Sequence, residues 1–246
     1  MRWAGFGSIW LMGLLVGGCA GSEACVDFTD EVLVVAAYTD DGKDTRVEVE
    51  LRRAAAGEDS IPVKLCADGS LAFDKVGLAG VKRPSGAVVY EAIMDSGTDT
   101  KPVLHTLRLE NDDGVSEFTG EIDAPGFAVS LPANNAKVSR AAELAIAWEP
   151  AREGTITLRL SDEIDGETCL AGPLELDAAD SGELKIAAGE IALSPDTSVK
   201  ATCAAFVTLS RRAEATLMTS RGGVTLHPDS RIEATNSRVR AFRSVP

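Results

Sequence analysis

Apolar and polar residues alternate at every second position over most of this chain, and this alternation limits the chain to β-structure. The segments 47–52 and 156–160 show it most clearly, with Val, Leu or Ile at one position and a polar residue at the next. Residues that favour turns, such as Asp40-Asp41-Gly42 and Asp165-Gly166, separate the alternating segments. A two-residue period is that of a half-buried strand, and no long stretch has the 3.6-residue period of a helix. The sequence therefore predicts an all-β protein.

The spacing of the alternating segments predicts two β-sandwich domains. Strands are expected in the first half at 31–38, 45–53, 61–66, 86–93, 102–109 and 126–131. Strands are expected in the second half at 143–148, 154–160, 183–187, 199–209, 215–219 and 230–242. The segment Leu131-Pro132-Ala133-Asn134-Asn135 reads as a linker between the halves. Short strands at this spacing are typical of antiparallel, immunoglobulin-like sandwiches of about 100 residues each. We expect domains at 25–131 and 132–246, and the alternative is one continuous barrel-like β-domain.

Residues 1–18 have the features of a secretory signal peptide. Arg2 supplies the positive charge, and a short apolar run ends in Gly17-Gly18. This run is too short for a comfortable membrane span, which needs about 20 residues. The stretch Leu15-Val16-Gly17-Gly18-Cys19 resembles a bacterial lipobox, in which acylation of the cysteine sulfur anchors the mature protein. We therefore expect Cys19 to be lipidated, with residues 19–24 as a tether. The alternative is a secreted protein that is cleaved near Ala24.

The lipobox resemblance also predicts where the protein resides. A lipid anchor of this kind implies the bacterial cell envelope. The residue after the cysteine is Ala20 rather than aspartate, a pattern that resembles outer-membrane sorting.

Four cysteines remain if Cys19 is acylated, and an even number in an oxidising compartment predicts disulfides. Three pairings are possible. Because the linker-like segment divides the chain, we favour Cys25–Cys66 and Cys169–Cys203 over a pairing across the two halves. A metal site is not expected, because no CxxC pair occurs and neither histidine lies near a cysteine in the sequence.

The net charge of −14 excludes some partners. Phosphate backbones repel such a chain, so nucleic-acid binding is not expected. Anionic headgroups repel it as well, so membrane attachment has to come from the lipid. The acidic surplus keeps a surface protein soluble, and the alternative is a binder of cations or of basic partners.

The segment Ile93-Met94-Asp95-Ser96-Gly97-Thr98 resembles the aspartic-protease signature, in which two carboxylates share a proton. A second copy would be needed, and Asp180-Ser181-Gly182-Glu183 is a poor one because Glu183 stands where Ser or Thr is required. Asp-Ser-Gly is also common in hairpin turns. We favour the turn and keep the Asp95 hydrolase as an alternative.

Other polar clusters are weaker candidates. The turns 39–44 and 111–117 are rich in acids that could bind Ca²⁺, but neither follows the EF-hand spacing. No GxSxG motif accompanies His105 or His227. Three arginines, Arg211, Arg212 and Arg221, form a basic cluster for which we expect a solvated strand edge, with a docking patch as the alternative. We expect Trp148 to pack in the second core, with ligand stacking as the alternative.

The second half resembles a group of uncharacterised bacterial envelope lipoproteins with tandem immunoglobulin-like β-domains. The resemblance rests on Leu144 to Trp148-Glu149-Pro150, the Asp180–Ile186 segment, Cys203, and the tail from Arg240 to Pro246. The first half is similar mainly through Tyr90-Glu91-Ala92 and the strand Val103–Leu109. The resemblance implies a fold and a location, and it carries no activity to transfer.

These observations predict a lipid-anchored envelope protein that binds or scaffolds, without catalysis and without a cofactor. Its expected contacts are the membrane, through the lipid on Cys19, and an envelope protein or glycan. The alternatives are an aspartic-protease-like hydrolase that uses Asp95, and a purely structural subunit of an envelope assembly.

Overall fold

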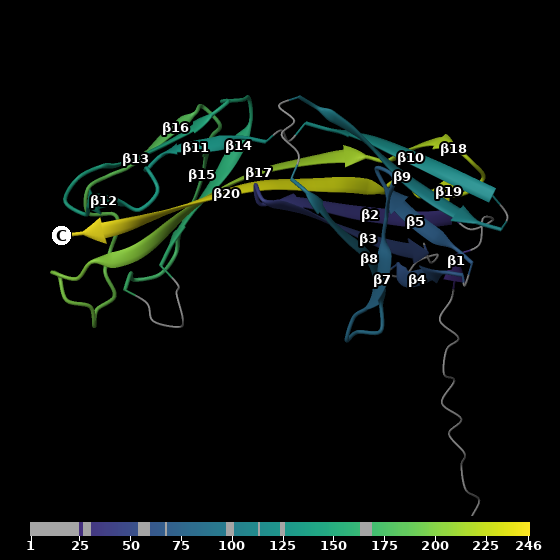
Figure 1. Ribbon diagram of the computed structural model, residues 1–246, viewed down its shortest axis with the longest axis horizontal. Helices are drawn as coiled ribbons and strands as arrows, with labels where there is room; N and C mark the ends of the chain where they lie inside the picture. Colours follow the sequence, from purple (N-terminus) through teal and green to yellow (C-terminus); the bar gives the residue numbers. More distant parts are fainter. Residues whose placement is uncertain are drawn as a thin grey trace, which may run out of the picture.

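The computed structural model describes residues 25–26, 31–53, 60–66, 68–96, 101–112, 114–123, 126–162 and 169–246. Every regular element in these ranges is a β-strand, which confirms the all-β expectation. Figure 1 shows two lobes joined into an arch, with the C-terminus in the second lobe.

Twenty strands follow one another along the described chain. The first lobe begins with β1 (Cys25–Val26), β2 (Glu31–Asp40), β3 (Asp44–Arg53), β4 (Ile61–Leu65), β5 (Ser70–Phe73), β6 (Val76–Gly77), β7 (Ala79–Lys82), β8 (Val88–Asp95), β9 (Val103–Asn111) and β10 (Gly114–Ile122). The remaining strands are β11 (Ala128–Leu131), β12 (Ala136–Ser139), β13 (Leu144–Glu149), β14 (Thr155–Ser161), β15 (Leu174–Ala179), β16 (Glu183–Ile186), β17 (Cys203–Thr216), β18 (Met218–Arg221), β19 (Thr225–Leu226) and β20 (Arg231–Val245).

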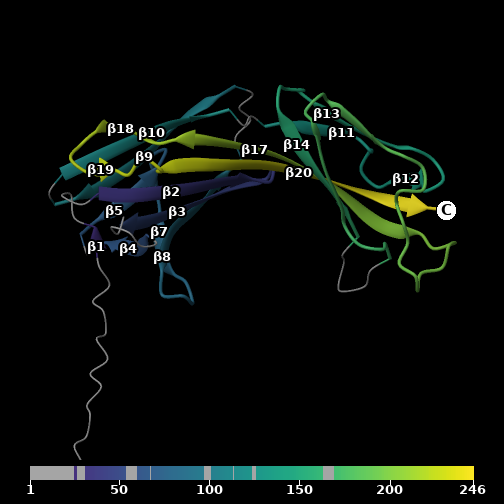
Figure 2. The same ribbon diagram turned by 180° about the vertical axis from the view of Figure 1, so that it is seen from behind.

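A single 12-stranded sheet runs through both lobes. Its main order is β1-β4-β3-β2-β20-β17-β14-β15, and the antiparallel pair β17–β20 is long enough to cross from one lobe to the other. Figure 2 shows these two strands passing between the lobes. The sequence predicted separate strands at 199–209 and 215–219, whereas β17 continues unbroken to Thr216. The intervening residues contain no Gly or Pro, so nothing in the backbone ends the strand.

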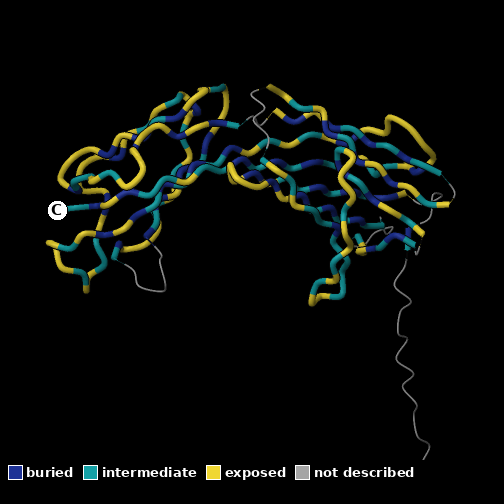
Figure 3. Tube along the Cα trace, viewed as in Figure 1, coloured by how far each residue is buried: buried dark blue, intermediate teal, exposed yellow. Residues whose placement is uncertain are grey.

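The core of the first lobe lies between this large sheet and a five-stranded sheet of order β18-β10-β9-β5-β6. Val47, Val49 and Leu51 of β3 alternate inward and are fully buried. They belong to one apolar cluster with Leu107 of β9 and Phe118 of β10. The alternation of buried and more exposed residues along these strands is visible in Figure 3. This lobe is therefore a sandwich, as the period-two pattern predicts.

The core of the second lobe lies between the far end of the large sheet and a three-stranded sheet of order β11-β13-β16. Leu158 of β14 and Val207 of β17 face Ile146 and Trp148 of β13 in one buried cluster. Trp148 is 3% exposed, so it packs in the second core as expected.

Each core contains residues from both sides of the expected domain boundary at 131/132. Phe127 and Val129 precede that boundary but belong to the second core. Leu217, Val224 and Ile232 follow it but belong to the first core. Residues 127 and 129 join the second core because β11 pairs with β13. Residues after the boundary return to the first core because β17 and β20 extend through both lobes.

Strand β10 was not expected from the sequence, and its composition explains why. Its buried face carries Ser116 and Gly120 beside Phe118 and Ile122, so the apolar alternation is weak. Among the described strands, four pairs are parallel rather than antiparallel, namely β1–β4, β2–β20, β12–β20 and β19–β2. A parallel pair joins segments that are distant in sequence, so local turn signals cannot reveal it.

Candidate functional site

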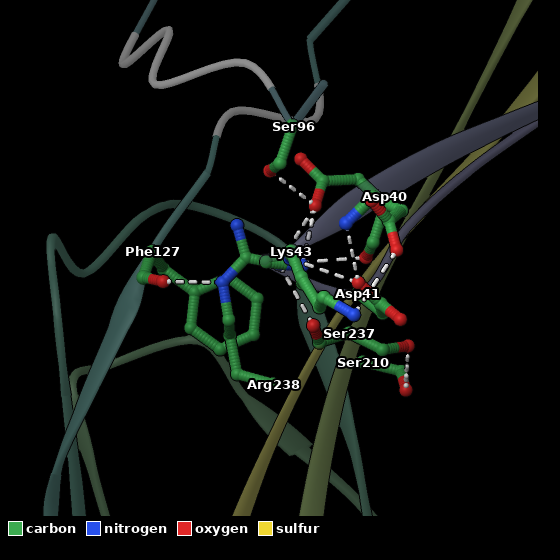
Figure 4. Close-up of polar contacts among 10 residues, drawn as sticks. Asp40, Asp41, Lys43, Ser96, Phe127, Ser210, Ser237 and Arg238 are labelled. Carbon is green, nitrogen blue, oxygen red and sulfur yellow. Dashed lines mark hydrogen bonds and ion pairs between the residues drawn. The ribbon is translucent and has the colours of Figure 1, made fainter. Parts of the chain in front are cut away.

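The most elaborate polar arrangement in the described chain lies where the lobes meet. Asp40 ends β2 and is 1% exposed. Its Oδ1 accepts hydrogen bonds from Ser96 Oγ at 2.8 Å and from Arg238 Nη1 of β20 at 3.2 Å. Figure 4 shows the Arg238 guanidinium between Asp40 and Phe127. The carboxylate of the first lobe is thus bound to a strand shared by both lobes.

A second buried ion pair faces the first from the other side of the junction. Asp180 and Arg211 are 3% and 4% exposed, and the Arg211 guanidinium donates to both carboxylate oxygens of Asp180. Trp148 Nε1 donates to Asp180 Oδ1 at 2.6 Å, and Arg211 also donates to the carbonyl of Pro150. This network fixes β17 to the turns that follow β13 and β15.

Phe127 connects the two ion pairs. The guanidinium carbons of Arg211 and Arg238 lie 4.7 Å and 5.5 Å from the centroid of its ring. Arg238 Nε also donates to the Phe127 carbonyl at 3.0 Å. A desolvated cation over an aromatic face contributes up to about 2 kcal/mol. We call the set Asp40, Phe127, Asp180, Arg211 and Arg238 the junction cluster.

Arg240 extends this attachment along β11. Its Nε and Nη2 both donate to the Val129 carbonyl, at 3.0 Å and 2.8 Å. Arg238 binds the Phe127 carbonyl in a similar way. These two arginines of β20 therefore hold the carbonyls of residues 127 and 129, at the start of the three-stranded sheet. Arginine side chains therefore join the two sheets along this seam.

A cavity of about 430 Å³ opens beside the junction cluster. It is lined by the β2–β3 turn, the end of β8, the start of β11 and the end of β13, with Lys43, Asp95, Glu149 and Arg238 as its charged residues. The charges of both signs in this lining allow hydrogen bonding to a polar ligand. None of the described lining residues forms the nucleophile–base pair that covalent catalysis requires.

The two aspartates of the protease-like segments are not brought into one dyad. Asp180 has both oxygens bound by Trp148 and Arg211, so it is not available to share a proton. Asp95 is exposed at the end of β8, where its cross-strand neighbour is Asp44. Aspartic-protease chemistry needs two carboxylates that share one proton.

The acidic turns serve the fold. Asp40 belongs to the junction cluster, and Asp41 Oδ1 accepts the backbone amides of Lys43 and Asp44 at 2.8 Å and 2.9 Å. These two hydrogen bonds lower the pKa of Asp41 below its ordinary value of 3.8. In the second turn, Asn111 Oδ1 accepts the amide of Gly114, and Asp113 lies outside the described residues. Within the described ranges, no group of three or more His, Cys, Asp or Glu is placed to hold a metal ion.

Disulfide bonds join Cys25 to Cys66 and Cys169 to Cys203, the two pairs that the sequence favours. The first fastens β1 beside β4 at the edge of the large sheet. The second ties β17 to the segment before β15. The lipidation candidate Cys19 lies outside the described residues.

The histidines occupy structural positions. His105 of β9 is 6% exposed, and its Nδ1 lies 2.6 Å from Asp74 Oδ2. Its ring stacks on Phe73 at 5.0 Å between centroids and lies 5.1 Å from Tyr38. His227 Nδ1 accepts the amide of Asp229 in a turn.

The expected basic cluster is not one surface. Arg211 is buried in the junction cluster, whereas Arg212 and Arg221 are exposed on β17 and β18. A docking patch made of all three arginines is therefore ruled out.

Sequence reasoning missed the role of Asp40, Phe127, Arg238 and Arg240. One signal was present: the alternation of β20 places Arg238 and Arg240 on the same face as Ile232 and Phe242. Two arginines on the buried face of a strand require buried partners, because an unpaired charge in a core is very costly. The pattern therefore signals such partners without identifying them.

Comparison with known proteins gives distant likenesses in fold. No family model and no curated protein matches the chain. Among solved structures, the chain is similar to the IG1+IG2 domains of DIP-gamma, with 7% identity and a TM-score of 0.23, over 80% of this chain and 98% of that one. It is similar to a titin Ig tandem at 8% identity and a TM-score of 0.21, over 83% and 98% of the two chains.

A third similar structure is the E. coli alpha-2-macroglobulin, at 11% identity and a TM-score of 0.21, over 89% of this chain and 14% of that one. At TM-scores this low, none of these likenesses bears on function. The described residues include no helix that is long and apolar enough to cross a membrane.

Proposed function

We propose that this chain is a lipid-anchored envelope protein that acts as a binding or scaffolding module, without catalysis. The observation that carries the proposal is the single sheet through both lobes, reinforced by the buried ion pairs of the junction cluster. A continuous ladder and a buried polar network resist bending of one lobe against the other. An arch of fixed shape suits a module that holds a partner at a set position.

The expected anchor on Cys19 gives this arch an orientation. A fully extended chain over positions 19–25 could span at most about 20 Å, at about 3.3–3.6 Å per residue. The Cys25–Cys66 disulfide fastens the end of this tether to the first lobe. In this proposal the first lobe stays close to the membrane, and the second lobe is the one that meets partners.

The rival functions are a hydrolase that uses Asp95 and an inert structural subunit. The engagement of Asp180 by Trp148 and Arg211 supports the non-catalytic role, because it leaves Asp95 without its expected second carboxylate. A hydrolytic activity of the purified mature protein that is lost in Asp95→Asn would overturn this part of the proposal.

The anchor is tested by cell fractionation of Cys19→Ala. We expect this variant to lose acyl labelling and to leave the membrane fraction. The matched control is the double variant Cys25→Ser/Cys66→Ser, which removes the disulfide at the end of the tether but leaves the lipobox intact and should stay in the membrane fraction. Membrane partitioning of Cys19→Ala without acylation would show that the anchor is wrong.

The binding role is tested by crosslinking in intact envelopes followed by purification of the tagged full chain. A stable stoichiometric partner supports a binding or scaffolding module. The absence of any crosslinked partner across several crosslinker lengths would contradict it.

A further inference from the structure

The outermost strand of the large sheet, β15, has an open backbone edge. Among the described strands it pairs only with β14. The Asp180 amide donates to the Gly154 carbonyl at 3.0 Å, and this bond continues the β14–β15 ladder. Because hydrogen-bonding direction alternates along a strand, the amides and carbonyls of Glu175 and Asp177 and the amide of Ala179 point away from β14. The Ala179 carbonyl accepts the Ser181 amide at 2.8 Å, so the open part of the edge ends before it. Such an edge can accept another strand.

The second sandwich is also open on its apolar side along β15. Leu174, Leu176 and Ala178 face the core side of this strand but are only half-buried. Leu184 of β16, the edge strand of the opposite sheet, is half-buried as well, and it packs against the same core. An added strand would therefore bury apolar surface as well as pair its backbone.

A cavity of mixed polar and apolar lining, to which Glu190 contributes, lies at the beginning of β15. It measures about 210 Å³ and lies between the start of β15 and the segment that follows β16. The larger apolar residues that line it are Leu160, Leu170, Pro173, Leu174 and Ile191. A volume of this size holds one or two aliphatic side chains, so the open edge ends in a pocket for a side chain of the added strand.

The acidic side chains along β15 and β16 determine which kind of strand can pair with this edge. Glu175 and Asp177 are exposed on the outer face of β15, and Glu183 and Glu190 are exposed on and after β16. Like charges placed opposite each other destabilise a strand pair. A second copy of β15 would bring Glu175 and Asp177 against the same acids. A strand with Lys or Arg at the matching positions would instead form cross-strand ion pairs.

We propose that the edge of β15 binds an extended segment of a partner polypeptide in which apolar and basic residues alternate, so that the segment adds one strand to the large sheet. Backbone pairing supplies affinity, and the cavity at the start of β15 together with the acids supplies register and selectivity. This inference rests on the proposed binding function and assigns it a surface and a class of partner.

The test uses the full chain and a fluorescent peptide of about eight residues in which valine and lysine alternate, a length typical of one strand. A peptide of the same composition with its lysines in one block is the first control.

The double variant Glu175→Lys/Asp177→Lys is compared with Glu110→Lys/Glu121→Lys, which makes the same charge change on the outer face of the five-stranded sheet. We expect the β15 variant to weaken binding at least about tenfold and the control variant to change it less than about twofold.

Hydrogen exchange locates the bound peptide. We expect the amides of Glu175, Asp177 and Ala179 to become protected when the alternating peptide binds, and not with the blocked one. The proposal would be overturned by equal binding of both peptides, by equal loss in both double variants, or by unchanged exchange at these amides. The acids would then serve only to prevent unwanted pairing at the β15 edge.

Failure of this inference is distinguishable from failure of the binding role. If an envelope partner crosslinks to the wild-type chain and equally to Glu175→Lys/Asp177→Lys, the binding role stands and the β15 edge is wrong. If no partner crosslinks to the wild-type chain, the binding role itself is contradicted.

Discussion

The Tyr90 hydroxyl accepts a hydrogen bond of 2.6 Å from the backbone amide of Leu65. This contact joins β4 to β8, two strands that pair with the same edge of β3. One edge of β3 pairs with β8 along its first part and with β4 along its last three residues. Beyond that point β4 leaves β3, and Tyr90 of β8 supplies a side-chain acceptor in place of the missing strand. The hydroxyl thus satisfies an amide that would otherwise be buried without a partner.

Replacing Tyr90 with Phe should destabilise the chain by about 1–3 kcal/mol, because the buried Leu65 amide loses its acceptor. Urea unfolding followed by tryptophan fluorescence measures the change. Tyr38→Phe is the matched control, since it removes the other tyrosine hydroxyl of the chain. A loss well under about 1 kcal/mol at position 90 would show that the Leu65 amide is satisfied in another way.

Burial raises the pKa of Tyr90 above its ordinary value of 10.0, and the hydrogen bond from the Leu65 amide opposes this shift. The folded state therefore holds the phenol proton more tightly than the unfolded state. The stability contributed by the neutral phenol is complete below pH 10 and is lost as the pH rises through the folded-state pKa.

Absorbance of phenolate in the Tyr38→Phe variant isolates this titration. We expect a midpoint above 10.0 in the folded chain and a midpoint close to the ordinary tyrosine value in urea. Coincident midpoints would contradict the burial of the hydroxyl.

The buried ion pair between Asp180 and Arg211 makes a second prediction. Asp180→Asn leaves the Arg211 guanidinium buried without a counter-charge, and we expect a loss of about 3–5 kcal/mol in unfolding free energy. Asp123→Asn is the control, because Asp123 pairs with Arg152 at 2.8 Å while its side chain remains 61% exposed. That change should cost less than about 1 kcal/mol. Similar losses in both variants would contradict the burial of the first pair.

Gly222 makes a third prediction through backbone geometry. Its φ is +110°, and a Cβ at this position would lie 2.5 Å from both the Cα of Ser116 and the carbonyl oxygen of Val115. Gly222→Ala should therefore move β18 away from β10 and lower the unfolding temperature by several degrees, on the scale of about 2–4 °C per kcal/mol for a chain of this length.

Gly86→Ala separates this clash from simple backbone strain. Gly86 also has a positive φ, +90°, but a Cβ there would meet nothing within 4 Å. We expect this variant to show only the strain of a left-handed alanine, about 1–2 kcal/mol. Equal melting temperatures for the two variants would show that β18 yields without cost.

Whether a feature can be predicted from the sequence depends on how many positions separate the residues that interact to form it. The strands β3 and β14 were predictable because Val, Leu or Ile recurs every second residue within each segment. The hairpin around Asp40-Asp41-Gly42 was predictable because its turn residues are contiguous. Strand β10 was not, because Ser116 and Gly120 fill buried positions where small residues fit against the opposite sheet.

The sequence by itself determined the all-β class, most strand positions and the preferred cysteine pairs, because alternation, turn residues and spacing are properties of neighbouring residues. Only the tertiary structure decided which charges are buried together and which strands run through both lobes. Asp40 and Arg238 are 198 positions apart. Phe127 contacts Arg211 and Arg238 because the pairing of β17 with β20 places these two arginines side by side. Local periodicity determines which face of a strand a side chain occupies. The partner of that side chain is determined by the order of strands in the sheets, and this order depends on how the apolar residues of the whole chain are buried together.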